Sequence, residues 1–322
     1  MINISKISDI LEQGLSDIKY PNQPLGLYRP IAYTLQSGGK RLRPKLVLAA
    51  CEAVGGDAVS AVNQAVALEM FHNFTLIHDD VMDRSMKRRG RPTVFHRWGD
   101  TQAILSGDAL LTMATQYMMK SCPADKLPSV LELFNRTAME VYEGQQYDIA
   151  NEKRERVTIK SYLMTIRLKT AVLLGCACAL GAIMGNGLQS DVDAMYEYGV
   201  NLGMSFQLRD DWLDIYGKTE EFGKNIGSDI VNRKKTWLYI TAMDEAGEAM
   251  DKIFSDTNGM ALRAVVSRVR RLYDTLNLSE RCDNLIENYH NLAIKALSNA
   301  NLSEENASFF ITLAATLSRR SI

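Results

Sequence analysis

The chain has few cysteines, histidines and prolines, and almost no excess charge. Five cysteines, four histidines and seven prolines occur among 322 residues, and the formal net charge is −1. No two cysteines have the CxxC spacing of a zinc site, and an odd number of cysteines among apolar neighbours favours reduced thiols in a cytosolic protein. So small a net charge provides no overall attraction to nucleic acid or to an anionic membrane.

The sequence also lacks the pattern of a leader peptide or a membrane span. Its first residues, MINISKISDILEQGL, include acids and lack the basic start and apolar run of a signal peptide. The longest apolar stretch, 171–184, contains glycines and is too short to span a bilayer. We therefore expect a cytoplasmic protein with no stable insertion into a membrane.

Apolar side chains are abundant and follow a helical period. Hydrophobic residues make up 46% of the chain, enough for a large core, and no sustained alternation typical of strands occurs. Glycines and prolines separate the segments, and no low-complexity linker or repeat divides the chain. We expect a single all-α domain over residues 1–322. The expected helices span about 3–18, 26–36, 43–54, 59–84, 100–119, 128–150, 159–184, 190–216, 234–253, 259–276, 280–298 and 303–319.

Two of these expected helices are apolar on most sides and yet end in aspartates. In the segment 59–84, Val62 and Val66 belong to one apolar row while Phe71 lies on another face. A helix of this kind is buried within a bundle. The segment 190–216 has the same character, so we expect a polar site inside the protein rather than on its surface.

The aspartates form two DDxxD motifs, in LIHDDVMD and FQLRDDWLD. Their members are Asp79, Asp80, Asp83, Asp210, Asp211 and Asp214. In a helix, the first and last aspartates of each motif lie on one face, where their charges repel unless a cation neutralises them. Mg²⁺ prefers oxygen ligands and keeps sites for substrate phosphate. An exposed acidic helix end would explain one copy, but two copies on apolar helices predict metals that grip a diphosphate.

Two basic groups accompany the motifs. The stretch 84–91 follows the first motif directly, and cations beside aspartates favour a polyphosphate over nucleic acid. Earlier, GGKRLRP combines Lys40, Arg41 and Arg43 with two glycines that let the backbone approach an anion. Alone, this string would be an ordinary helix start. Two further strings are weaker signals: GQQYD, with Gln145 and Asp148, and the pair Lys169-Thr170.

Taken in order, these strings resemble the trans-isoprenyl diphosphate synthase family, also called polyprenyl synthetases. The resemblance runs from GGKRLRP through DDVMD, RRGRPTV, GQQYD, KT and FQLRDDWLD to GKNIGSDI, and covers about residues 38–240. It implies a bundle of long antiparallel helices around a deep central cavity, usually as a homodimer. It also implies a Mg²⁺-dependent prenyltransferase of the short-chain type. Such an enzyme joins isopentenyl diphosphate head-to-tail to dimethylallyl, geranyl or farnesyl diphosphate, and here the product would be geranylgeranyl or farnesyl diphosphate.

The resemblance implies roles for residues of this chain. Together with substrate, about three Mg²⁺ ions would be held at a site made by Asp79, Asp80, Asp83, Asp148, Asp210, Asp211 and Asp214. The allylic diphosphate would contact Arg88, Lys169, Lys224 and Lys234. The isopentenyl diphosphate would contact Lys40, Arg43, His72 and Arg89. The catalytic group would be Lys169, Thr170, Gln207 and Lys224, of which Thr170 and Gln207 would face the allylic cation.

The closing lysine and the catalytic base are the least defined parts of this site. Lys234 would close the site from the loop 217–235, but many bacterial relatives have glycine immediately before it, whereas this chain has Arg233. The geometry of Lys234 is therefore open at this point. No side chain is an obvious base, so the departing diphosphate is the expected proton acceptor.

Phe74 and Thr75 are the candidates for setting product length. They lie five and four positions before Asp79, roughly 6–7.5 Å down the helix axis. A ring at Phe74 would form a floor, and in the family small residues at this position accompany long products. We expect a product of fifteen to twenty carbons, about the length that such a floor allows. If Phe74 were only core packing, Leu110 or Met113 would set the length.

Three other functions share part of this pattern. The pair His78-Asp79 occurs in metal-dependent phosphohydrolases, but that class needs further histidines and only His72 precedes the pair. A terpene cyclase or head-to-head synthase would need neither GGKRLRP nor a complete second DDxxD. A non-catalytic subunit of the same fold should have lost aspartates, and none is missing.

Overall fold

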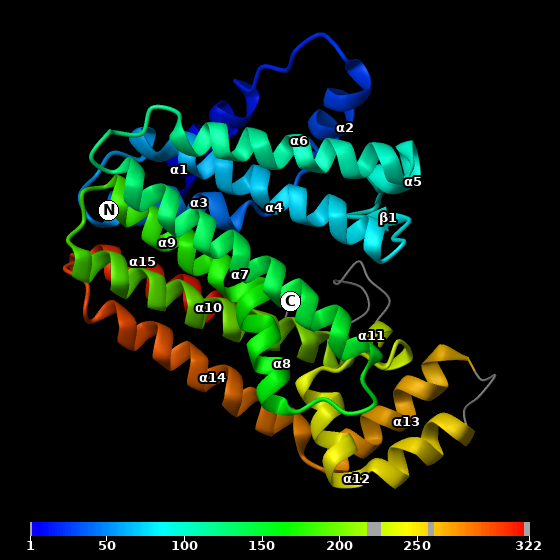
Figure 1. Ribbon diagram of the computed structural model, residues 1–322. Helices are drawn as coiled ribbons and strands as arrows, with labels where there is room; N and C mark the ends of the chain where they lie inside the picture. The colour runs from blue at the N-terminus through cyan, green and yellow to red at the C-terminus, as the bar shows by residue number, and fades with distance from the viewer. Residues whose placement is uncertain (1, 218–226, 257–260, 319–322) are drawn as a thin grey trace. The chain divides into compact units, whose positions relative to one another are not determined.

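The computed structural model describes residues 2–217, 227–256 and 261–318, which are predominantly helical (Figure 1). The helices are α1 (Ile4–Ser16), α2 (Leu25–Leu35), α3 (Leu42–Ala53), α4 (Val62–Met82), α5 (Val94–Trp98), α6 (Asp100–Met119), α7 (Leu127–Lys153), α8 (Ile159–Ile166), α9 (Val172–Met184), α10 (Gln189–Tyr216), α11 (Ser228–Val231), α12 (Trp237–Asp256), α13 (Leu262–Thr275), α14 (Leu278–Leu297) and α15 (Glu304–Ser318). The shorter elements are the 3-10 helix η1 (Ala58–Ala61), the π-helical turn η2 (Arg167–Ala171) and a hairpin of β1 (Lys87–Arg88) and β2 (Arg91–Pro92). The expectation of an all-α fold is confirmed.

Polar side chains just before several helices explain where those helices begin. Asn3 Oδ1 accepts hydrogen bonds from two N–H groups in the first turn of α1, at 3.0 and 3.1 Å. Thr158 Oγ1 does the same for α8 at 3.1 Å, and Thr93 Oγ1 for α5 at 3.0 Å. Because the first N–H groups of a helix have no partner within it, such caps fix the starting residue.

The described chain divides into two compact units. The first unit comprises residues 1–135, 176–196 and 299–307, and the second comprises 136–175, 197–298 and 308–322. The helices α7, α9, α10 and α15 contribute residues to both units. Each of the two aspartate motifs belongs to a different unit, and a single domain over residues 1–322 stays a prediction.

In the first unit, α4 and α6 lie side by side (Figure 1). Gly107 of α6 allows the close approach, since a Cβ at this position would lie 2.2 Å from Nε2 of His78 on α4. On another face of α4, the fully buried ring of Phe71 meets Phe134 edge-on, with centroids 5.4 Å apart. The apolar rows of α4 therefore do cover more than one buried face, as the sequence predicts.

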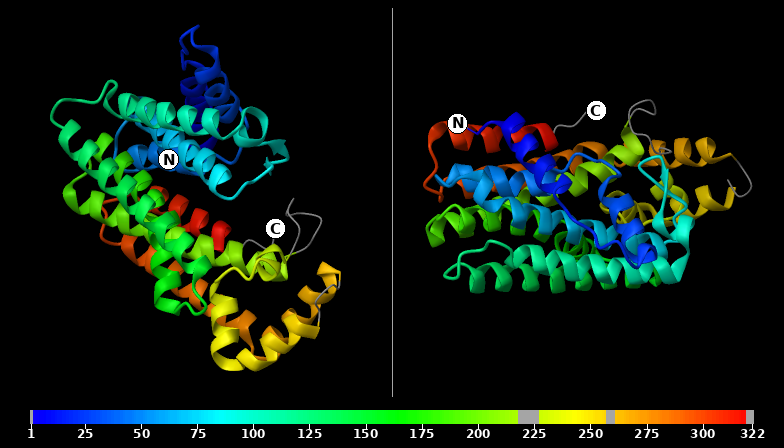
Figure 2. Two further views of the ribbon diagram at one scale, coloured as in Figure 1. Left: turned by 45° about the vertical axis from the view of Figure 1, so that its right-hand side comes forward. Right: turned by 90° about the horizontal axis from the view of Figure 1, so that it is seen from above.

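In the second unit, α12 and α13 lie side by side, and α14 packs against both (Figure 2). The helices α10 and α15 are joined by Tyr198, which is fully buried and donates a hydrogen bond from its hydroxyl to the carbonyl of Phe310 at 2.8 Å. The two rings also meet edge-on, with centroids 5.3 Å apart. This unit holds the second aspartate motif at the end of α10.

One continuous helical segment in the described chain, Ile159–Met184, is long and apolar enough to span a membrane by composition alone. This segment is longer than the apolar stretch 171–184 of the sequence. The helix continues through the polar pair Lys169-Thr170, so the residues before that pair belong to the same segment. The most apolar part has a mean hydropathy of 1.7, and 78% of it is buried inside the protein. Burial of this extent is what a core helix of a soluble protein shows.

The expected helices match the observed ones within a few residues, with three exceptions. The hairpin β1–β2 and the short helices α5 and α11 were not expected. Each of these strands and helices is five residues or shorter, too short to show a period in the sequence. The expected helix 159–184 also contains the π-helical turn η2, which widens the helix at Lys169 and Thr170.

Candidate active site

The first aspartate motif lies at the C-terminal end of α4 in the first unit. The N–H of Asp83 donates a hydrogen bond to the carbonyl of Asp79 at 2.8 Å, so the helical geometry continues through the motif. Asp79 and Asp83 therefore lie one turn apart on one face, as their spacing predicts. Asp83 is exposed and Asp79 half-buried.

The middle aspartate, Asp80, differs from its neighbours because it is buried and paired. Nε and Nη2 of Arg88 both lie 2.9 Å from its Oδ1. Burial raises the pKa of Asp80, and the guanidinium of Arg88 opposes this shift. Arg88 comes from the hairpin β1–β2, whose turn residues Arg89 and Gly90 both have positive φ, as the tight hairpin turns of type I′ require. The basic stretch after the motif is thus folded back onto it.

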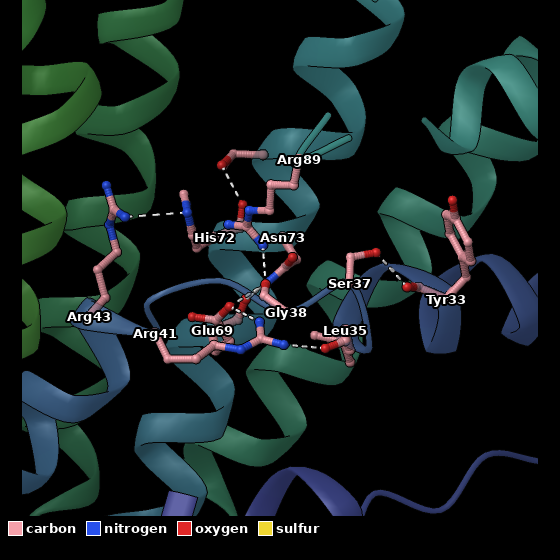
Figure 3. Close-up of polar contacts among 11 residues, drawn as sticks. Tyr33, Leu35, Ser37, Gly38, Arg41, Arg43, Glu69, His72, Asn73 and Arg89 are labelled. Carbon is pink, nitrogen blue, oxygen red and sulfur yellow. Dashed lines mark hydrogen bonds and ion pairs between the residues drawn. The ribbon is translucent and has the colours of Figure 1, made fainter. Parts of the chain in front are cut away.

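A buried ion pair supports the string GGKRLRP, also in the first unit (Figure 3). Arg41 has a left-handed backbone and pairs with Glu69 of α4, and its guanidinium also donates to the carbonyl of Leu35. The amide of Asn73 donates to the same carboxylate at 2.7 Å. Sequence reasoning missed Glu69, although a single acid inside the apolar run ALEMF was the available signal.

Two of the side chains expected to bind isopentenyl diphosphate, Arg43 and Arg89, lie near His72 (Figure 3). Nη1 of Arg43 lies 3.3 Å from Nε2 of His72, and Arg89 donates to the carbonyl of Gly38. Burial, and then the positive charges of Arg43, Arg89 and other arginines, hold the pKa of His72 well below its usual value. His72 is therefore neutral and can accept from Arg43. Lys40 is exposed in the loop before α3.

Phe74 lies below the motif as expected, within an aromatic cluster of the first unit. It is 6% exposed, and its ring centroid lies 5.7 Å from that of Phe71 and 4.7 Å from that of His78. Thr75 turns its hydroxyl to the carbonyl of His72 at 2.8 Å. The imidazole of His78 packs against α6, with Nε2 3.2 Å from the carbonyl of Ile104, so it belongs to helix packing rather than to a phosphohydrolase centre.

The second unit brings Lys169 and Asp148 together. Nζ of Lys169 lies 2.6 Å from Oδ2 of Asp148. The approach depends on Gly144 of α7, because a Cβ there would lie 2.3 Å from the backbone nitrogen of Lys169. Asp148 follows Gly144 by one helical turn, so the glycine of the GQQYD string places its aspartate at the π-helical turn.

Thr170 and Gln207, expected to face the allylic cation, are hydrogen-bonded to each other. Oγ1 of Thr170 lies 3.2 Å from Oε1 of Gln207. Here the close approach is at Gly203 of α10, where a Cβ would lie 2.5 Å from Cα of Ala171. Gln207 follows Gly203 by one turn, so α10 carries its amide to the hydroxyl of Thr170.

The second motif has two buried aspartates with hydrogen-bond partners. Asp211 accepts from the hydroxyl of Tyr162 at 2.6 Å and from the amide of Gln207 at 2.9 Å. Asp214 accepts from Oγ of Ser228 at 2.9 Å and from the N–H of Asp229 at 3.0 Å, and so ties α11 to α10. Asp210 is half-buried.

Lys234 lies close to these carboxylates, and its Nζ is 3.8 Å from Oδ2 of Asp229. Burial lowers the pKa of Lys234, but Asp211, Asp229 and further acids outweigh it, so the pKa is raised and the amine stays charged. Arg233 has a φ of 48°, in the left-handed region that favours glycine, and its guanidinium stacks over the ring of Phe254 at 4.3 Å. Lys224, in the same loop 217–235, lies outside the described residues.

A cavity of about 150 Å³ in the second unit collects most of these groups. Its polar lining includes Asp148, Lys169, Thr170, Gln207, Asp211 and Lys234. One part offers ammonium groups for an anion, and the adjoining part offers neutral oxygens for a cation. Both properties suit a substrate whose diphosphate departs and leaves an allylic cation.

The donor set of the motifs fits Mg²⁺ better than a transition metal. Among the described residues, no group of three or more histidines, cysteines and acids is close enough to hold a metal by itself. Mg²⁺ does not need such a group, because it uses one or two carboxylates and completes its shell with water and substrate phosphate. The pair Asp79 and Asp83 on one face of α4 has the composition that this mode of binding requires.

The all-α fold is that of the isoprenoid synthases, and the comparison of sequences identifies the family. The profile of the polyprenyl synthetase family matches residues 25–276, so the chain belongs to this family. A geranylgeranyl diphosphate synthase of Saccharolobus solfataricus is 38% identical over 276 residues, covering 84% of this chain and 83% of that protein. A short chain isoprenyl diphosphate synthase of Methanothermobacter thermautotrophicus is 38% identical over 238 residues, or 74% and 72% of the two chains.

Solved structures agree with this result. A crystal structure of a geranylgeranyl pyrophosphate synthase aligns over 99% of both chains with a TM-score of 0.93 and 36% identity. A geranylgeranyl pyrophosphate synthetase from Pyrococcus horikoshii aligns over 98% of both chains with a TM-score of 0.91 and 31% identity. The resemblance that the motifs suggested is therefore confirmed, together with the fold class.

Proposed function

We propose that this protein is a short-chain isoprenyl diphosphate synthase, which joins isopentenyl diphosphate head-to-tail to an allylic diphosphate and releases diphosphate. The observation that carries the proposal is the cavity of the second unit. It combines the ion pair of Lys169 and Asp148 with the hydrogen-bonded oxygens of Thr170 and Gln207. An anion site beside a cation-stabilising site is what ionisation of an allylic diphosphate requires.

The metal in this proposal is Mg²⁺. Asp79, Asp83 and Asp210 would hold it, while Asp148 and Asp214 would support the site. When bound, Mg²⁺ supplies Lewis acidity that makes the diphosphate a better leaving group. Asp80 and Asp211 already accept hydrogen bonds within the protein, and this favours a supporting role for both.

The cationic side chains divide between the two substrates. Lys40, Arg43, His72 and Arg89 would hold isopentenyl diphosphate. Arg88, Lys169, Lys224 and Lys234 would contact the allylic diphosphate, and the last of these would close the site. The tight pair of Lys169 and Asp148 supports this division, because the carboxylate fixes the ammonium group where an anion can reach it.

The reaction itself follows from these groups. As the allylic C–O bond breaks, Lys169 and its neighbours compensate the charge that develops on the diphosphate. The oxygens of Thr170 and Gln207 stabilise the allylic carbon by their dipoles. The double bond of isopentenyl diphosphate then attacks this carbon, and the departed diphosphate accepts the proton. Water has to be excluded, since it would trap the cation as an alcohol.

The product has fifteen to twenty carbons in this proposal, because Phe74 lies about 7.5 Å down α4 from Asp79 and closes the path of the growing chain. Phe74→Ala should therefore lengthen the products of a folded, active enzyme. Thr75→Ala tests the second candidate, whose hydroxyl is hydrogen-bonded to the carbonyl of His72. An active Phe74→Ala variant with unchanged product length would remove Phe74 from this role.

We also propose that the protein is a homodimer, and that it is cytoplasmic without stable insertion into a membrane. Large apolar side chains on α6, Ile104 and Leu105, are 46% and 54% exposed and would be covered in a dimer. Sedimentation of the purified protein tests this point.

Removal of metal tests the proposed chemistry. Protein treated with EDTA should lose condensation activity and regain it with Mg²⁺, or in part with Mn²⁺. Full activity in metal-free protein would contradict the use of a metal clamp.

A further inference from the structure

A chain of hydrogen bonds in the second unit links a buried tyrosine to the residue expected to face the allylic cation. The hydroxyl of Tyr162 donates to Oδ2 of Asp211 at 2.6 Å, and the amide of Gln207 donates to Oδ1 of the same carboxylate at 2.9 Å. At the other end of its side chain, Gln207 accepts from Oγ1 of Thr170 at 3.2 Å. All four side chains line one cavity.

The chemistry of the donors fixes the direction of this chain. A carboxylate can only accept hydrogen bonds, so Gln207 must present its NH₂ group to Asp211. Its carbonyl oxygen then faces Thr170 and accepts the hydroxyl proton. Because the hydroxyl proton of Thr170 points to Gln207, the lone pairs of the Thr170 oxygen can point into the cavity. In the inverted amide, Gln207 would present its oxygen to the carboxylate and repel it.

Tyr162 fixes the carboxylate that in turn fixes Gln207. Its side chain is 4% exposed and comes from α8, whereas Asp211 and Gln207 both belong to α10. Without the tyrosine hydroxyl, one oxygen of Asp211 would lose its partner and the carboxylate could rotate about its last bond.

We propose that Tyr162 is a positioning residue, which acts through Asp211 to orient the amide of Gln207 and the hydroxyl of Thr170 toward the developing allylic cation. The inference rests on the proposed function and adds to it a role for Tyr162. It also gives Asp211, the middle aspartate of the second motif, an orienting role instead of a metal-binding one.

The test compares Tyr162→Phe with Tyr198→Phe. Both tyrosines are buried in the second unit and donate one hydrogen bond, but Tyr198 donates to a backbone carbonyl of α15 and lies outside the cavity. For Tyr162→Phe we expect kcat to fall about tenfold, with KM for both substrates and the Mg²⁺ concentration for half-maximal rate unchanged. The share of allylic alcohol in the products should rise. Both substitutions should lower the melting temperature by a similar amount, since each removes one buried hydrogen bond. Tyr198→Phe should leave kcat unchanged.

A double-mutant cycle separates orientation from a general loss of stability. Gln207→Met removes both hydrogen bonds of the amide at similar volume, and Tyr162→Phe should add little to its effect on kcat. Fully additive effects, or equal kcat values for Tyr162→Phe and Tyr198→Phe, would overturn the inference.

Asp211→Asn decides the matter if Tyr162→Phe does not fold. Asparagine keeps an acceptor for Tyr162 but offers NH₂ to Gln207, so the amide should invert and kcat should again fall about tenfold. Normal kcat, or kcat restored by more Mg²⁺, would overturn the inference. An inactive wild-type protein would instead contradict the proposed function. If the wild-type protein is inactive, crystal structures can still test the orientation of the Gln207 amide. Gln207 should occupy several rotamers in Tyr162→Phe and one in Tyr198→Phe.

Discussion

The two DDxxD motifs have the same sequence spacing and sit at the ends of similar apolar helices, yet their aspartates have different surroundings. In the first unit the middle residue, Asp80, pairs with the guanidinium of Arg88, and the last residue, Asp83, is exposed. In the second unit the middle residue, Asp211, accepts from neutral donors, and the last residue, Asp214, is buried and holds the start of α11.

This difference shows that the helices packed around a repeated motif can give its aspartates different surroundings. In the first motif the last residue, Asp83, is exposed, whereas in the second Asp211 and Asp214 are both buried and hydrogen-bonded to neighbouring groups.

The largest expected effect comes from removing the proposed metal ligands. Asp79→Ala and Asp210→Ala should each lower kcat by about a thousandfold or more, equivalent to roughly 4 kcal/mol. Asp80→Asn should have a smaller effect because its carboxylate is paired within the protein. Steady-state kinetics at saturating Mg²⁺ measure this, with the exposed Asp125→Ala as the control. Near-normal kcat in both alanine variants would contradict the clamp.

The buried ion pair of the first unit should be the next most sensitive feature. Glu69→Ala leaves the guanidinium of Arg41 buried without its carboxylate, which should lower the free energy of unfolding by about 3–5 kcal/mol. The exposed pair of Glu245 and Arg281, with an N–O distance of 2.7 Å, is the control, and Glu245→Ala should cost far less. Urea titration measures both, and equal losses would mean that burial of the pair does not matter.

The second unit should instead depend on close backbone contact. Gly203→Ala places a methyl group 2.5 Å from Cα of Ala171, so α10 must move away from η2 and weaken the contact of Gln207 with Thr170. We expect a loss of about 1–3 kcal/mol in unfolding free energy together with a lower kcat. Gly247→Ala, whose nearest neighbour lies 3.9 Å away, should be neutral or slightly stabilising. Similar behaviour of the two variants would contradict the packing argument.

The smallest expected effect is a dependence of stability on pH through His72. Its pKa is lowered in the folded protein, so the unfolded chain binds the extra proton first as pH falls below about 6.5. Stability from this group is therefore fully present above pH 6.5 and declines below it, by up to about 1.4 kcal/mol per pH unit. His72→Gln should remove this part of the slope between pH 7 and 5.5. Parallel pH curves for the two proteins would show that His72 is not buried as a neutral group.

The sequence predicts the helices and the candidate site residues from signals that lie within a few residues of one another. The period of α4 and the spacing of Asp79 and Asp83 are local, and the structure agrees with both. The partners that tune the site are distant in sequence. Glu69 and Arg41 are 28 positions apart in the sequence, and Tyr162 and Asp211 are 49 positions apart. No local sequence pattern predicts either contact.

The π-helical turn at Lys169 and Thr170 escaped sequence reasoning for a related reason. Its sequence, RLKTA, has no helix breaker, and the turn is flanked by close contacts to Gly144 and Gly203 from two other helices. The glycines are visible in the sequence, but the helix that each one contacts is set by the tertiary structure.

Product analysis of the wild-type protein tests the central claim most directly. Purified protein would be incubated with Mg²⁺, labelled isopentenyl diphosphate and geranyl or farnesyl diphosphate, and the products separated by chromatography. We predict labelled all-trans prenyl diphosphates that stop at fifteen to twenty carbons, about the length that Phe74 allows, with one diphosphate released per condensation. Folded protein that forms no labelled prenyl diphosphate with either Mg²⁺ or Mn²⁺ would contradict the proposed function.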